Sequence, residues 1–230
     1  MQLDAPIRRN GVLVEVPTVT LRGPNDHRIE IIGVLHIADR AFWHYLNTRL
    51  ELLSRMRWAV NYEMVRMTKQ DQRRLRFMTA SSNFLAKRAK RAGLVPQTNG
   101  FSLPLFAKNT DLPGSVLARM VKRPGIKYWL RLSLARIILN LLPTRAFREM
   151  MAVVFTKTVT AGYGGVSGIN DDIIIDLRNQ VAAQACLIER QNVVTVWGAA
   201  HVQGIASLLE DKGYVVTGIQ WLPVYAVNSK

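Results

Sequence analysis

Cysteine is almost absent from this sequence, because Cys186 is the only one in 230 residues. One cysteine cannot form a disulfide within the chain, which excludes a small disulfide-stapled domain and is typical of a reducing compartment. The first ten residues also lack the apolar run of a secretion signal. We therefore expect a cytoplasmic protein.

Long hydrophobic runs are missing as well. The longest apolar stretch, residues 129–142, is shorter than the about 20 residues that a membrane-spanning helix needs. Arg131 and Arg136 interrupt it. With 49% hydrophobic and 20% charged residues the chain nevertheless has the composition of a folded protein. Its length supports one core, so we expect one domain, residues 1–230, at most peripheral to a membrane.

Acidic residues are scarce, with 16 Asp and Glu against 31 Lys and Arg and a formal net charge of +15. The imbalance is local: between Arg66 and Arg148 there are 18 Lys and Arg but only Asp71 and Asp111. The rest of the chain is close to neutral. The basic character therefore belongs to a middle segment and not to the whole fold.

Hydrophobic periodicity predicts alternating strands and helices. Strands are expected at residues 11–21, 28–32, 58–62, 193–197 and 214–219. Helices are expected at residues 38–56, 71–92, 126–142, from 144 onward, 170–190 and 202–212. This order predicts an α/β fold with a central mixed, largely parallel sheet flanked by helices. We expect residues 1–66 and 168–230 to form its core, with 67–167 as a basic, mostly helical insertion.

Parts of the insertion are expected to have little regular secondary structure. Residues 94–111 contain prolines and are expected to be irregular, and a short helix is expected after Asp111. The glycine-rich stretch 161–168 follows a helix and lacks a P-loop signature, so it predicts a flexible loop. Asn170 is expected to cap the helix that follows.

Two Gly-x-x-His motifs follow strands at both ends of the chain. The first is Gly33-Val-Leu-His36 and the second is Gly198-Ala-Ala-His201. Ligands of α/β sheets bind beyond the carboxyl ends of strands, and a glycine there allows a sharp turn or a close approach. Glu63 ends the strand at 58–62 and is expected at the same edge of the sheet. The sequence thus predicts one site built from His36, Glu63 and His201.

Two histidines and a carboxylate allow two kinds of chemistry. They are a ligand set for a divalent transition metal, which would acidify a bound water for attack on a carbonyl. They also work without metal, with Glu63 or His36 as a general base and His201 stabilising charge. The residues alone leave both alternatives open.

The motifs together resemble the TraB/GumN (TIKI-like) family, which is related more distantly to erythromycin esterases and to ChaN-like haem-binding proteins. The similarity covers residues 28–66 and 168–219. It rests on the two Gly-x-x-His motifs, on a strand ending in Glu63, on Arg178-Asn179, and above all on the run from Val196 to Val216. Residues 67–167 show no such similarity.

This resemblance implies a hydrolase of an amide or ester bond in a small molecule or a peptide. It implies His36, Glu63, Arg178 and His201 as catalytic residues, and Gly33, Asn179 and Gly198 as substrate-binding residues. His36, Glu63 and His201 would hold a divalent metal, manganese or cobalt rather than zinc. Many relatives have an acidic residue directly before the arginine, where this chain has Leu177, so Asp176 is the nearest acidic candidate to pair with Arg178.

Two other functions remain open from the sequence. The same pocket could bind haem, a peptide or a lipid-like molecule without catalysis. The basic segment 67–148 could bind an anionic membrane surface, because residues 126–142 are apolar except for a stripe of Ser133, Arg136 and Asn140. Aromatic residues among the arginines are sparse, which favours lipid over nucleic acid as the partner. A lid over the site or a dimer interface remains equally open for the apolar stretch 126–142.

Overall fold

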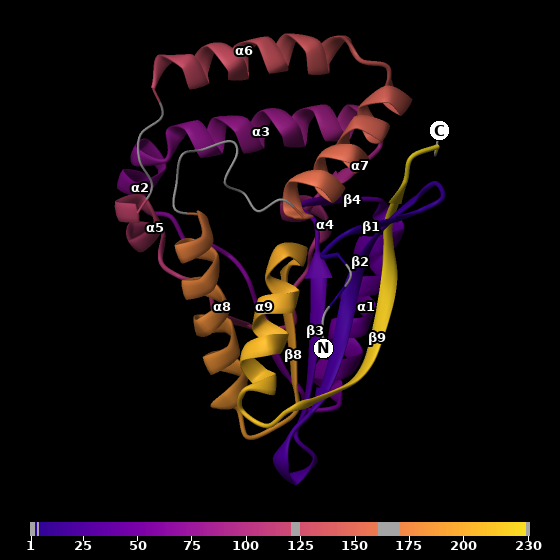
Figure 1. Ribbon diagram of the computed structural model, residues 1–230, viewed down its shortest axis with the longest axis vertical. Helices are drawn as coiled ribbons and strands as arrows, with labels where there is room; N and C mark the ends of the chain where they lie inside the picture. The colour runs from indigo at the N-terminus through magenta and orange to yellow at the C-terminus, as the bar shows by residue number, and fades with distance from the viewer. Residues whose placement is uncertain (1–2, 4, 121–124, 161–170, 229–230) are drawn as a thin grey trace.

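A β-sheet with helices on both faces forms the centre of the protein, seen in a computed structural model that describes residues 3, 5–120, 125–160 and 171–228 (Figure 1). The sheet order is β1-β2-β3-β8-β5-β7, and β9 pairs with β2. The strands are β1 (Arg8–Asn10), β2 (Leu13–Arg22), β3 (Arg28–Val34), β5 (Ala59–Tyr62), β7 (Lys108–Asn109), β8 (Val193–Gly198) and β9 (Val215–Ala226). The predicted α/β class is confirmed.

The sheet is mixed, and its parallel part contains the two motifs. Strands β3, β8, β5 and β7 run parallel to one another, whereas β1, β2 and β9 pair in antiparallel fashion. Strand β8 lies between β3 and β5. It is buried on both sides as Val-Val-Thr-Val-Trp, the near-continuous apolar run expected of a central parallel strand.

Helices cover the two faces of the sheet. Helix α1 (Arg40–Arg55) packs Leu46 and Leu50 against one face, because its apolar residues recur at helical spacing. Helices α8 (Asp171–Leu187) and α9 (Ala199–Glu210) cover the other face. The remaining helices are α2 (Lys69–Arg74), α3 (Arg76–Arg91), α4 (Gln97–Gly100), α5 (Gly114–Met120), α6 (Ile126–Leu141) and α7 (Thr144–Thr160).

Several boundaries differ from the predicted ones. The helix expected at 71–92 is two helices, and the first begins earlier because Thr68 and Asp71 form a capping box. The stretch 94–111 is not wholly irregular, since it contains β6 (Val95–Pro96), which pairs with β4 (Ile37–Ala38), and also α4 and β7. Strand β9 extends to Ala226, far past the expected end at 219, because it pairs along all of β2. The loop at 161–168 and the Asn170 cap lie outside the described residues.

The basic middle segment is partly built into the core. Strand β7 extends the parallel sheet beside β5, and Phe147, Met151 and Ala152 of α7 belong to the hydrophobic core. The division into a core and a separate insertion is therefore less sharp than predicted. Figure 1 shows β3 pointing toward the layer of helices formed by α3, α6 and α7.

Arg148 of α7 connects this layer to the sheet. Its side chain is buried and donates to the carbonyl oxygens of Ala226 (2.8 Å) and Ala92 (2.9 Å) and to Oδ1 of Asp39 (2.7 Å). A buried guanidinium is tolerated only when its donors and charge are matched, and here they are. Among the described residues, no helix combines the length and the apolar character that crossing a bilayer requires.

Candidate active site

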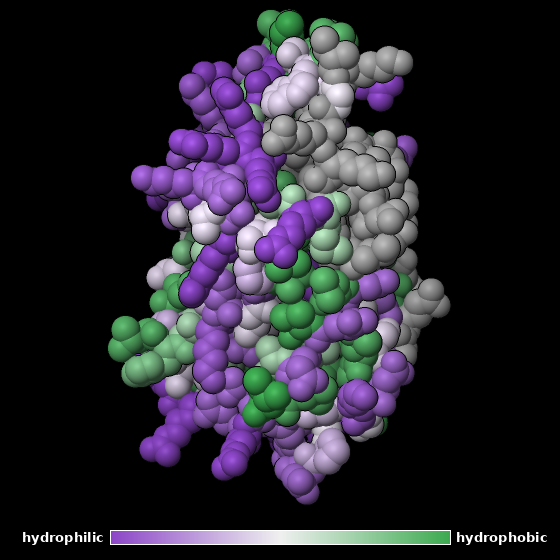
Figure 2. All heavy atoms as spheres, turned by 90° about the vertical axis from the view of Figure 1, so that its left-hand side faces the viewer, coloured by the Kyte–Doolittle hydropathy of each residue, from purple (hydrophilic) through white to green (hydrophobic). Residues whose placement is uncertain are grey.

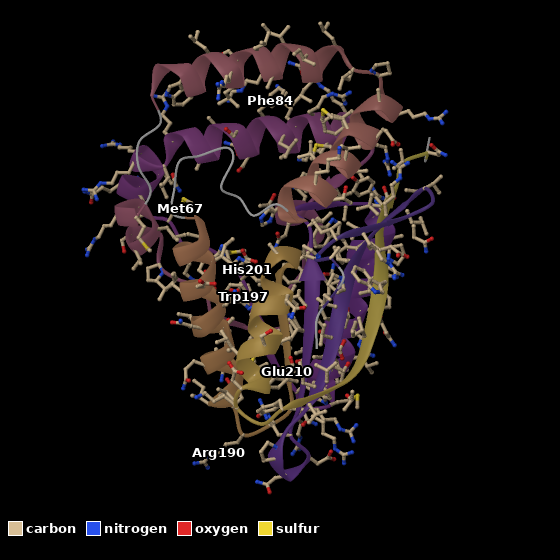
Figure 3. The ribbon with its side chains drawn as sticks, in the orientation of Figure 1. Met67, Phe84, Arg190, Trp197, His201 and Glu210 are labelled. Carbon is tan, nitrogen blue, oxygen red and sulfur yellow. The ribbon has the colours of Figure 1, made fainter. Side chains whose placement is uncertain are left out.

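The ends of three adjacent parallel strands carry the residues predicted from the motifs. His36 follows β3, Glu63 follows β5 directly, and His201 lies in the first turn of α9 after β8. Because β8 lies between β3 and β5, all three residues reach the same edge of the sheet, as predicted. Figure 3 shows His201 beside Trp197 near the middle of the molecule, below the α3 layer.

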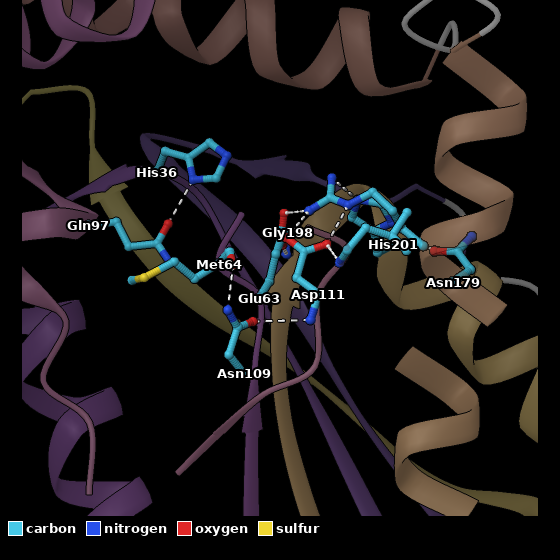
Figure 4. Close-up of polar contacts among 11 residues, drawn as sticks. His36, Glu63, Met64, Gln97, Asn109, Asp111, Asn179, Gly198 and His201 are labelled. Carbon is cyan, nitrogen blue, oxygen red and sulfur yellow. Dashed lines mark hydrogen bonds and ion pairs between the residues drawn. The ribbon is translucent and has the colours of Figure 1, made fainter. Parts of the chain in front are cut away.

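Arg178 of α8 is the centre of a polar cluster with Glu63, Asp111 and His201, the three partners that Figure 4 labels. Its Nη2 donates to Oε1 of Glu63 at 2.5 Å, and its Nη1 lies 3.2 Å from Nε2 of His201. Its Nε and Nη2 also form a two-pronged ion pair with the carboxylate of Asp111, at 2.9 and 2.8 Å. The guanidinium plane matches a carboxylate in this way, which gives both charge and orientation.

Asp111 was not among the predicted site residues. It follows β7 by two residues, and its carboxylate is fully buried against Arg178. Asp176, the acidic candidate nearest to Arg178 in sequence, is exposed on α8 instead. One signal pointed to Asp111: it is one of only two acidic residues in the strongly basic segment 66–148.

Glu63 is held in the charged form. Its Oε1 accepts from Arg178, and its Oε2 accepts from the backbone N–H of Gly198. Burial alone would raise the pKa of Glu63, but the charge of Arg178 and the Gly198 hydrogen bond oppose this and the pKa is lowered. A side chain at Gly198 would place its Cβ 3.1 Å from Glu63 Oε2, so glycine allows this close approach.

His201 is held in the neutral form with a defined tautomer. A guanidinium can only donate, so Nε2 of His201 accepts from Arg178, and Nδ1 donates to Oδ1 of Asn179 at 2.7 Å. Trp197 packs edge-on against the imidazole, with ring centroids 5.3 Å apart. Burial and the positive charge of Arg178 lower the pKa of His201 from 6.5 to about 4, despite the opposing effect of Glu63.

The three residues predicted to bind substrate have structural contacts in this arrangement. Asn179 orients His201, and Gly198 fixes Glu63. Gly33 is buried in β3, where a Cβ would lie 2.8 Å from the carbonyl oxygen of Pro17, so it allows close packing of β2 on β3. Their contact with substrate stays a prediction.

His36 stands apart from the Arg178 cluster. It is exposed, and its Nδ1 donates to Oε1 of Gln97 at 2.7 Å (Figure 4). Gln97 begins α4, within the stretch expected to be irregular, and its backbone N–H donates to the carbonyl of His36. A positive charge on His36 would lower the pKa of both Glu63 and His201, so its ring lies within electrostatic range of the cluster without contacting it.

The donor set does not fit a divalent metal as it is arranged. The Nε2 lone pair of His201 and both oxygens of Glu63 are used by Arg178 and Gly198, and His36 pairs with Gln97 instead of joining them. Among residues 3, 5–120, 125–160 and 171–228, no group of three His, Cys, Asp or Glu side chains is placed to hold a metal ion. The cation that Glu63 and Asp111 share is the guanidinium of Arg178.

No protein-family model matches the chain, and no curated protein or solved structure is significantly similar to it. The similarity to TraB/GumN proteins therefore stays a prediction from the motifs, and inferences about function rest on the geometry of this site.

Proposed function

We propose that the protein hydrolyses an ester or amide bond in a small molecule or peptide, with His36 as the general base. The observation that carries the proposal is the state of the His36 ring. Gln97 accepts the proton on Nδ1, so the lone pair of the neutral imidazole lies on Nε2, which has no hydrogen-bond partner within the described part of the chain. A neutral imidazole fixed in this way is the usual proton acceptor of hydrolytic enzymes.

In the proposed reaction, Nε2 of His36 takes a proton from water while the water oxygen bonds to the substrate carbonyl carbon. The same nitrogen then returns the proton to the leaving oxygen or nitrogen as the carbon–oxygen or carbon–nitrogen bond breaks. Substrate would bind beside His36, at the edge of the sheet where Glu63 and Arg178 lie. No step requires a metal.

The buried cluster would stabilise the transition state. A guanidinium has five N–H donors, and within the described part of the chain four contacts to Asp111, Glu63 and His201 leave one donor on Nη1. A donor fixed before the reaction and aimed at the carbonyl oxygen is worth about 3–4 kcal/mol of barrier lowering. Glu63 and Asp111 keep the guanidinium in place, so they are positioning residues.

The test is hydrolysis of a panel of chromogenic esters and peptide anilides in the presence of a chelator. His36→Ala is expected to lower kcat by about 10²–10⁴-fold, the usual contribution of a general base. His44→Ala, which changes an exposed histidine of α1, is the matched control and should be silent. Turnover that His36→Ala leaves unchanged, or no turnover of any panel member, would refute the proposal.

A non-catalytic ligand-binding role is the second candidate. The observation that favours it is that Glu63, Asp111, Arg178 and His201 already satisfy one another, which is how a rigid binding site is built. Haem would then be detected as a visible absorption band that His36→Ala removes. A colourless preparation from haem-replete cells would exclude haem as the ligand.

A further inference from the structure

Helix α6 displays its apolar side to the exterior. Five large hydrophobic side chains on one face are between 49% and 79% exposed, namely Leu130, Leu134, Ile137, Ile138 and Leu141, called here the α6 stripe. Their spacing of four, three, one and three residues places them within about one third of the helix circumference. In Figure 2 hydrophobic side chains stand at the top edge of the molecule, where Figure 1 places α6, with hydrophilic side chains gathered below.

The polar contacts of α6 point toward the protein instead. Arg136 donates to the carbonyl of Ala80 on α3 and packs on the ring of Phe84, which lies between the two helices (Figure 3). Arg88 of α3 donates to the carbonyls of Leu139 and Leu142 at the end of α6. These contacts and the partly buried Leu139 join one side of α6 to the protein and leave the α6 stripe on the outer side of the helix.

The surroundings of the α6 stripe are cationic. Arg91 reaches Asn140 of α6, and Arg131 and Arg145 are exposed on α6 and just after it. The only two acidic residues between Arg66 and Arg148 do not offset this charge at the surface, because Asp71 is buried in the capping box and Asp111 is buried against Arg178. The exterior of this segment therefore carries positive charge and no exposed carboxylate.

We propose that the α6 stripe docks on the surface of an anionic lipid bilayer. An exposed apolar face flanked by arginine and lysine is the arrangement of interfacial helices, whose apolar side chains enter the headgroup region while the basic groups meet lipid phosphates. A second copy of this chain is a poorer partner, because two strongly cationic segments would face each other. Nucleic acid is also a poorer partner, because its phosphate backbone would lie against the five apolar side chains of the α6 stripe.

The experiment is co-sedimentation of the intact protein with vesicles of phosphatidylcholine, alone or mixed with phosphatidylserine. Binding is expected only with phosphatidylserine and should weaken as salt rises toward physiological strength, where the screening length is about 8 Å. The paired change Leu134→Glu and Ile137→Glu should lower the affinity at least roughly tenfold, since it removes apolar insertion and adds negative charge. Leu52→Glu, at an exposed leucine of α1, is the matched control and should bind normally.

Three outcomes would overturn the proposal. One is the absence of sedimentation with phosphatidylserine vesicles even at low salt. Another is self-association in analytical ultracentrifugation that Leu134→Glu with Ile137→Glu abolishes while vesicle binding is unaffected. The third is tighter binding to RNA or DNA than to vesicles at equal salt. Circular dichroism of each variant shows whether it is folded, and Arg131→Glu offers a second, milder test of the charge contribution.

Discussion

At the scale of single residues, the site is organised by one cation and one neutral imidazole. Burial and the positive charge of Arg178 outweigh the attraction of Glu63, so the pKa of His201 is lowered and its imidazole stays neutral. In the unfolded chain, neither burial nor Arg178 acts on the imidazole of His201. This histidine would then titrate near the ordinary value of 6.5.

This difference predicts a pH dependence of stability. Between pH 6.5 and about 4 the unfolded chain binds a proton at His201 that the folded protein does not, so the free energy of unfolding should fall as pH falls. The loss attributable to His201 is about 3 kcal/mol over that window. Urea unfolding across pH measures it. His201→Gln should flatten the slope and His44→Gln should not; equal slopes in the parent and His201→Gln would contradict the assignment.

Asp111→Asn tests the buried ion pair. Removing one partner of a buried pair leaves an uncompensated charge and typically costs about 3–5 kcal/mol. Asp176→Asn, at an exposed position of α8, should change stability by less than about 0.5 kcal/mol. Chemical denaturation of the two variants in parallel decides between Asp111 and Asp176 as the partner of Arg178.

How far the sequence could predict this site differs from residue to residue. His36, Glu63 and His201 could be placed at one edge of the sheet because each follows a strand, and strand ends in a parallel sheet share an edge, but the separation of His36 from the Arg178 cluster could not be predicted. Asp111 could not, because it reaches the site through β7, a strand of two residues with no periodicity to detect. Gln97, the partner of His36, could not be predicted either. It begins α4, a helix of four residues within the proline-containing stretch 94–111, which we expected to be irregular.

At the scale of elements, the packing of α8 on α9 sets the position of His201. Gly204 of α9 faces Asn179 of α8, and a Cβ there would lie 2.1 Å from Asn179 Nδ2. The run from Val196 to Val216, which includes this glycine, therefore contributes to helix packing as well as to the site. Only a glycine lets the two helices approach closely enough for Asn179 to hold the imidazole.

Gly204→Ala should consequently destabilise the protein. Overpacking costs about 1–3 kcal/mol, which exceeds the roughly 1 kcal/mol that alanine gains over glycine inside a helix. The displaced Asn179 should also release His201, seen as a changed imidazole ¹⁵N shift. Gly218→Ala, where nothing lies within 4 Å of the added Cβ, is the control. A more stable Gly204→Ala protein would show that the two helices can separate without cost.

At the scale of the whole molecule, the basic segment contributes a strand to the sheet and side chains to the main hydrophobic core. The sequence could indicate its charge and helices but not its attachment, because attachment depends on long-range contacts such as those of Arg148 with Ala226 and Asp39. Periodicity reports which face of a helix is apolar. It does not report that α7 packs into the main core.

Replacing residues 67–167 by a short linker should therefore prevent folding. The deletion removes β7, the Asp111 partner of Arg178, and the buried side chains of α7. Circular dichroism and a thermal melt check this. Arg148→Leu is the point-substitution counterpart, expected to cost about 3–5 kcal/mol because it removes the charge partner of Asp39 and the donors to the carbonyls of Ala226 and Ala92. Arg145→Leu, at an exposed position of the same helix, should cost little. A cooperative thermal unfolding transition of the shortened chain would show that the rest of the protein folds without residues 67–167 and would contradict this prediction.

The most direct test concerns the cation in the site. Thermal unfolding of chelator-treated protein is followed while Mn²⁺ or Co²⁺ is added, in the parent and in Glu63→Gln and His201→Gln. Because Arg178 and the backbone N–H of Gly198 already engage Nε2 of His201 and both oxygens of Glu63, neither ion should raise the Tm of the parent. A concentration-dependent rise in Tm, as mass action requires of a specific ligand, that both substitutions abolish would contradict the account and restore a metal centre.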